Sequence, residues 1–161
     1  INNDDSTFAV ADKVYDRAIP IDLDSRAEPF QCEKTEAVTV STEHLEALFA
    51  QAREAYPLSA DMEKKLEDLN TYLIKNFKLA FGNRIIKQTR DFVPVYIACG
   101  GTELEAVDFM VAKKVLRKFE SLSLGFMKDQ LTKFESYLDK LFGRNKMSIC
   151  KEYMEYLKKN N

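Results

Sequence analysis

The chain has 161 residues, 45% hydrophobic and 31% charged, a balance that supports a folded core and excludes a wholly disordered protein. A formal net charge of -2 argues against non-specific nucleic-acid binding as the main activity, because such binding needs a strong positive field. The three cysteines (Cys32, Cys99 and Cys150) form no C-x-x-C pair, so we expect buried free thiols in a reducing cytoplasm. No apolar run reaches the ~20 residues that span a bilayer, so we expect no membrane contact.

Residues 1–40 are irregular and acidic. Ile19, Ile21 and Leu23 alternate with polar residues and proline, which predicts a short strand half-buried on one side. The rest of this region reads as a loop, with a second short strand at Ala37–Val40. Residue 1 is Ile rather than Met, so we expect a fragment of a longer protein.

Helical periodicity begins at Ser41, which is placed to cap a first helix that ends at Pro57. One face of that helix is expected to be buried, and it carries Leu45, Leu48, Phe49 and Ala52. Ser59 is placed to cap a longer second helix, for which Gly82 is the predicted end. Its apolar stripe comprises Met62, Leu66, Leu69, Leu73, Phe77 and Ala80.

A third helix is predicted from Asn83, with Pro94 expected to kink it or end it early. Thr102–Glu105 has the pattern of a capping box and predicts a fourth helix running to about Glu120. Two more apolar stripes follow and are separated by Gly143; they carry Met127, Leu131, Phe134, Leu138 and Leu141, then Ile149, Tyr153, Met154 and Leu157. The sequence therefore predicts a mainly α fold, an irregular bundle of about six helices after a short strand and loop.

Three segments together resemble the C-terminal half of McrB-type AAA+ proteins, the NTPase subunits of modification-dependent restriction systems. They are Ile1–Phe8 with Asp12–Ala18, Phe81–Ile86 with Asp91–Val93, and Ala112–Phe119. The resemblance implies that residues 1–40 are the C-terminal remnant of an α/β core with its connecting loop, and that residues 41–161 form the helical lid domain.

The resemblance also implies roles for individual residues. Asn2 matches sensor 1, which holds the attacking water, and Arg17 matches the arginine finger, which reaches a neighbouring subunit's γ-phosphate. Gly82 and Arg84 match sensor 2, a lid element that contacts the nucleotide of its own subunit. Each position has a plainer interpretation: a turn asparagine for Asn2, an ion pair with Asp12 or Asp16 for Arg17, and an ordinary surface arginine for Arg84.

The sequence contains no G-x-x-x-x-G-K-[ST] loop, so this chain lacks the groups that cradle phosphates and bind Mg²⁺. We therefore expect no cofactor and no hydrolysis in this chain alone, and Mg-ATP or Mg-GTP hydrolysis only in a full-length oligomer. The implied partners are neighbouring subunits of its own ring, with a nuclease subunit and DNA reached through the full complex. The alternative function is a free-standing helical module that binds a protein or a nucleic acid.

A basic stripe lies on the predicted fourth helix, where it could touch DNA or an adjacent subunit; it comprises Lys113, Lys114, Arg117 and Lys118. We favour the interpretation that this stripe is a solvated face, because runs of charge on helices usually are.

Overall fold

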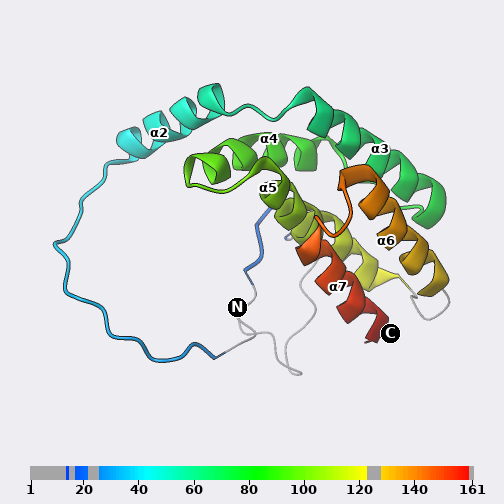
Figure 1. Cartoon of the computed structure of the whole chain (residues 1–161). Helices are drawn as coiled ribbons and strands as arrows, with labels where there is room; N and C mark the ends of the chain where they lie inside the picture. Colours follow the sequence, from blue (N-terminus) through cyan, green and yellow to red (C-terminus); the bar gives the residue numbers. More distant parts are fainter. Residues whose placement is uncertain (1–13, 15–16, 22–25, 123–127, 160–161) are drawn as a thin grey trace.

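The computed structural model describes residues 14, 17–21, 26–122 and 128–159 (Figure 1). Within these ranges it contains six α-helices and no strand, which confirms a mainly α fold. The helices are α2 (Thr42–Ala55), α3 (Ala60–Phe77), α4 (Asn83–Ala98), α5 (Glu103–Met110), α6 (Lys128–Phe142) and α7 (Ser148–Lys159). α5 continues into a π-helical segment, η1 (Val111–Val115), and a 3₁₀ segment, η2 (Leu116–Ser121).

Three predicted helix starts are confirmed by their caps. The Ser41 hydroxyl accepts a hydrogen bond from the His44 backbone at 3.2 Å, and Ser59 accepts one from the Met62 backbone at 3.2 Å. Thr102 forms the complete capping box that its spacing with Glu105 predicts. These caps satisfy backbone N–H groups that have no partner inside the helix.

The predicted helix ends are only partly confirmed. α3 ends at Phe77, before Lys78 in the left-handed conformation, so the prediction that Gly82 ends this helix is wrong. Pro94 does not stop α4 early, because the helix runs on to Ala98 with Pro94 buried inside it. Gly143, with a φ of 106°, follows the last residue of α6 as expected.

The core is shared by α3, α4, α6 and α7 and by the continuous helical stretch formed by α5, η1 and η2 (Figure 1). The rings of Phe77, Phe119 and Phe134 meet there, with centroids 4.8 to 5.8 Å apart. The α3 stripe faces this core, and five of its six predicted members are buried: Met62, Leu66, Leu69, Leu73 and Phe77. Ala80, the sixth, lies beyond the end of the helix and is exposed.

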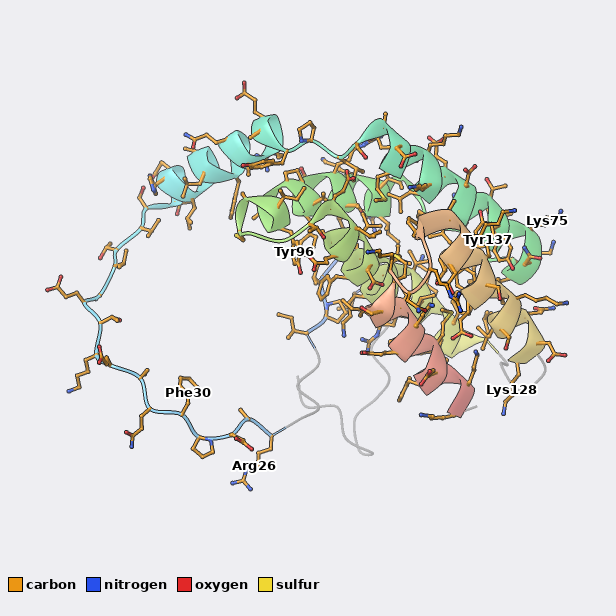
Figure 2. All side chains as sticks on the ribbon, viewed as in Figure 1. Arg26, Phe30, Lys75, Tyr96, Lys128 and Tyr137 are labelled. Carbon is orange, nitrogen blue, oxygen red and sulfur yellow. The ribbon has the colours of Figure 1, made fainter. Side chains whose placement is uncertain are left out.

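The predicted strands are absent from the described residues. Ile19–Ile21 and Ala37–Val40 carry no strand pairing, and the end of the first predicted strand lies outside the described residues. Residues 26–41 instead run extended and exposed, and Arg26 and Phe30 lie well away from the helices (Figure 2). Alternating apolar residues make a strand only when a neighbouring strand pairs with their backbone, and the described part of the chain offers no strand to pair with.

α2 contacts α4, but its apolar face is not fully covered. Leu45, Leu48 and Phe49 stay 41 to 45% exposed, and only Ala52 of that face is buried. The expectation that this face is buried is therefore wrong for its three large side chains. None of the described helices combines the length and the apolarity that crossing a membrane requires.

Candidate functional site

The candidate site lies between α3 and α4, where the chain enters α4. Phe81 is buried, and its backbone N–H donates to the Asn70 side-chain oxygen at 3.0 Å. Gly82 follows in an extended conformation and has no side chain to cap the helix. Phe81 therefore anchors the connection, while Gly82, Asn83 and Arg84 remain exposed at the start of α4.

Arg84 is the first cation of α4. It is exposed, and its side chain makes no hydrogen bond or ion pair with the part of the chain that the structure describes. The first turn of an α-helix presents backbone N–H groups and the positive end of the helix dipole. A guanidinium at this position therefore adds positive charge where the helix is already positive, and the combination is suited to an anion.

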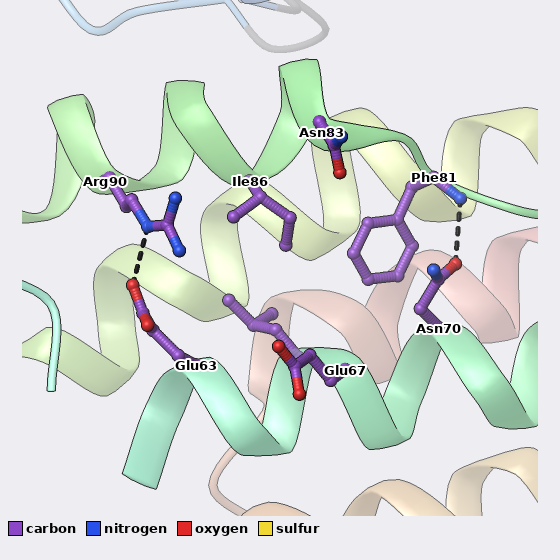
Figure 3. A pocket seen from close by; sticks show the side chains of 8 residues that line it. Glu63, Glu67, Asn70, Phe81, Asn83, Ile86 and Arg90 are labelled. Carbon is purple, nitrogen blue, oxygen red and sulfur yellow. Dashed lines mark hydrogen bonds and ion pairs between the residues drawn. The ribbon is translucent and has the colours of Figure 1, made fainter. Parts of the chain in front are cut away.

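A pocket of about 200 Å³ opens beside this helix start (Figure 3). Its lining mixes charged, amide and apolar groups from both helices: Glu63, Leu66, Glu67, Asn70, Phe81, Asn83, Ile86 and Arg90. The ion pair between Glu63 and Arg90, 2.6 Å between Oε1 and Nε, spans one end. The bond between Asn70 and Phe81 spans the other end.

The charged side chains of the pocket determine which charge a bound ligand could carry. The hydrogen bond to Glu63, and then the charges of Glu63 and Glu67, raise the pKa of Arg90. Two carboxylates face one guanidinium, so the pocket itself disfavours an anion. An anionic group would be held outside it, at Arg84 and the helix start. Within the described ranges, no group of three or more His, Cys, Asp or Glu side chains is placed to hold a metal ion.

The structure places some of the predicted site residues and leaves others untested. Gly82 and Arg84 lie together at the start of α4. Arg17 is exposed in a turn near η1, and no hydrogen bond or ion pair joins its side chain to Arg84 or to any other described residue. Asn2 lies outside the described residues. Asp12 and Asp16, the alternative partners of Arg17, lie outside them as well.

The interpretation of the basic stripe as a solvated face is wrong. Lys114 is only 4% exposed and donates to the backbone carbonyl of Ala18. The other three residues are half-buried, and all four have interaction partners: Lys113, Lys114, Arg117 and Lys118. A signal for this burial was present in the sequence, since Lys114 follows Met110 and Val111 at intervals that share the buried helix face.

Asp108 was not predicted from the sequence to have a role, but the structure buries it, with 2% of its surface exposed. Its carboxylate accepts hydrogen bonds from the backbone N–H groups of Ile149 and Cys150 at 2.8 and 2.9 Å. The signal was one acid within the otherwise apolar stretch 106–112, because a charged side chain is buried only if it is paired. Its partners are 41 and 42 residues away, so the sequence could not name them.

Comparison with known proteins gave no match: no known protein family, no curated protein and no solved structure matches this chain.

Proposed function

We propose that this chain serves as the helical lid of an McrB-type AAA+ nucleoside triphosphatase and that it presents Arg84 to a bound nucleotide. The observation that carries the proposal is the exposed Arg84 at the start of α4, after Gly82, with no partner in the described part of the chain. A cation at the positive end of a helix is locally unfavourable, which supports a role for Arg84 outside the bundle. The nucleotide's phosphates are the anion proposed here.

In this proposal the chain supplies two arginines to the nucleotide, and other parts of the protein bind the phosphates and Mg²⁺. The phosphate-binding loop and the Mg²⁺ ligands would come from a half that this sequence does not hold, and hydrolysis of ATP or GTP would occur only in the assembled ring. Arg84 would contact the nucleotide of its own subunit, and Arg17 that of the neighbour. A fixed guanidinium suits this role because it stays charged and stabilises negative charge on the transferred phosphoryl group. A nuclease subunit and DNA would be partners of the complete assembly.

The first experiment compares Arg84→Ala with Lys87→Ala in a protein that includes the phosphate-binding half. Lys87 is an exposed cation on the same helix and has no partner in the described ranges, so it controls for the loss of one positive charge. We expect Arg84→Ala to weaken binding of a fluorescent nucleotide and to suppress hydrolysis, and Lys87→Ala to change neither. Equal behaviour of the two variants would remove the role assigned to Arg84.

A second experiment separates the two arginines by mixing subunits. An Arg17→Ala subunit should be rescued in part by a partner with an intact Arg17 and an inactive phosphate loop, because each supplies what the other lacks. An Arg84→Ala subunit should gain nothing from the same partner. Loss of an arginine finger lowers the rate by roughly 10³-fold or more, so the rescue is measurable. Equal recovery in both mixtures would show that the two assignments are wrong.

The alternative function, a helical interaction module, has one observation in its favour. The apolar face of α2 keeps Leu45, Leu48 and Phe49 partly exposed, which is typical of a surface that another helix covers. In this case the double substitution Leu48→Glu and Phe49→Glu would abolish self-association or partner binding in light scattering. The lid proposal predicts that the same substitutions leave nucleotide affinity unchanged.

A further inference from the structure

Lys114 is a buried cation for which the proposed nucleotide chemistry gives no role. Removing a lysine ammonium from water is costly unless polar groups replace the lost hydration. The ammonium of Lys114 donates to the backbone carbonyl of Ala18, which is 96 residues away in the sequence. This contact joins the helical bundle to the N-terminal part of the chain.

The acceptor belongs to a single turn of backbone. The N–H groups of Arg17 and Ala18 both donate to the carbonyl of Val14 at 3.0 Å, so the backbone at Arg17 and Ala18 is hydrogen-bonded as at the C-terminal end of a helical turn. Carbonyl groups are left unpaired at the C-terminal end of such a turn, and a cation placed there is favourable. Lys114 therefore binds the turn at its C-terminal end, one residue after Arg17.

The position of Lys114 is fixed by the packing of η1. Three of the five residues of this π-helical segment are apolar and buried: Val111, Ala112 and Val115. A π-helical segment inside a helix is uncommon and frequently accompanies a functional position. Since the neighbours of Lys114 are held in the core, its side chain has little freedom to follow the N-terminal turn if that turn moves.

We propose that Lys114 is a positioning residue that fixes the Arg17 turn to the lid, so that Arg17 projects into solvent from a set place on the bundle. Arg17 is exposed, and within the described ranges its side chain makes no ion pair that would tie it to the bundle. The inference rests on the proposed function, in which Arg17 acts on the nucleotide of a neighbouring subunit. Movement of the lid would then move the arginine with it.

Limited proteolysis of this chain tests the contact directly. Trypsin cleaves after Arg17 only when the turn opens, whereas Arg26 lies in the exposed extended segment and gives an internal reference rate. We expect Lys114→Met to raise the ratio of cleavage after Arg17 to cleavage after Arg26 about ten-fold, because a charge-assisted hydrogen bond is lost. Lys114→Arg should restore most of the protection, since it keeps a charged donor.

Two controls separate positioning from general stability. Lys64→Met removes an exposed lysine of α3 with no partner in the described ranges and should leave the ratio unchanged. Hydrogen exchange of α3 and α6 should be the same in Lys114→Met and the unsubstituted chain. If Lys114→Met does not fold, Lys114→Gln takes its place; its shorter, neutral side chain does not replace the charge-assisted hydrogen bond, so the ratio should still rise. An unchanged ratio in a folded variant overturns the proposal.

The functional part is measured in a protein with the phosphate-binding half. Lys114→Met should lower kcat and leave the KM for nucleotide unchanged, because Arg17 would be misplaced while Arg84 still binds. A raised KM with an unchanged kcat would overturn the positioning role. If the unsubstituted protein hydrolyses no nucleotide, the proposed function fails and the role of Arg17 fails with it. The proteolysis ratio then still decides whether Lys114 holds the turn.

Discussion

The carboxylate of Asp108 on α5 lies 2.9 Å from the backbone nitrogen of Cys150, near the start of α7. The same carboxylate accepts a second bond from Ile149, so one buried side chain caps a helix that begins about 40 residues later. A negative charge at this end of α7 also complements the helix dipole. Asp108 therefore joins α5 and α7 through a charged contact inside the apolar core.

Replacement of Asp108 should lower the stability of the fold. Asp108→Ala leaves two backbone N–H groups without their acceptor, and we expect a loss of about 2–3 kcal/mol in the free energy of unfolding. Asp108→Asn keeps one acceptor oxygen and should cost less. Urea denaturation measures both, with Asp91→Ala, an exposed acid on α4, as the control. Equal midpoints for Asp108→Ala and Asp91→Ala would contradict the capping role.

A side chain at Gly101 should destabilise the fold while Tyr96 is present. A Cβ atom at Gly101 would overlap the Tyr96 ring, so the ring must move when alanine is introduced. We expect Gly101→Ala to cost about 1–2 kcal/mol, as overpacking does elsewhere. In a Tyr96→Ala background the same change should cost much less. A double-mutant cycle by urea denaturation gives the coupling, and additive effects would show that the ring is not the obstacle.

Tyr153 should make stability fall at high pH. Burial, and then its hydrogen bond to the Glu120 carboxylate, raises the pKa of Tyr153 above its ordinary value. Above pH ~10 the unfolded chain loses this proton while the folded chain keeps it, so the plot of unfolding free energy against pH slopes downward there. Tyr153→Phe should reduce that slope, whereas Tyr56→Phe, at an exposed position, should not. Stability is measured by denaturation from neutral to alkaline pH.

Thiol reactivity should divide the three cysteines into two classes. The expectation of three buried thiols holds only for Cys150, because Cys32 and Cys99 are exposed. Burial, and then Asp108, raises the pKa of Cys150, which lowers the fraction of reactive thiolate. A colourimetric thiol reagent should therefore modify two thiols rapidly in the folded chain and the third only on unfolding. Rapid modification of all three would contradict this assignment.

Arg84 should be dispensable for folding. Its exposed side chain has no partner in the described ranges, so Arg84→Ala should not lower the free energy of unfolding. At low salt, where the helix dipole is least screened, the substitution should raise it slightly because it removes a positive charge from the positive end of α4. Arg90→Ala on the same helix removes the ion pair with Glu63 and should lower stability in a salt-dependent way. Thermal unfolding at low and high salt compares the two. A large loss for Arg84→Ala would point to a structural role.

The sequence by itself predicted the structural features that depend on residues close together in the chain. The caps at Ser41, Ser59 and Thr102 were predictable because each hydroxyl bonds a backbone group three residues later. The buried stripe of α3 was predictable because its spacing matches one face of a helix. The Gly82 and Arg84 part of the candidate site could be named for its place at a helix start, whereas its nucleotide role rests on a resemblance and stays a prediction.

Only the tertiary structure decided which charges are buried and which apolar faces stay open. Asp108 and Lys114 are buried and hydrogen-bonded to Cys150 and Ala18, which lie 42 and 96 residues away in the sequence. The apolar residues of α2 stay partly exposed because α4 covers only part of that face. Periodicity identifies the face of a helix that favours burial, but burial itself depends on which distant segment packs there, and a single sequence does not contain that pairing.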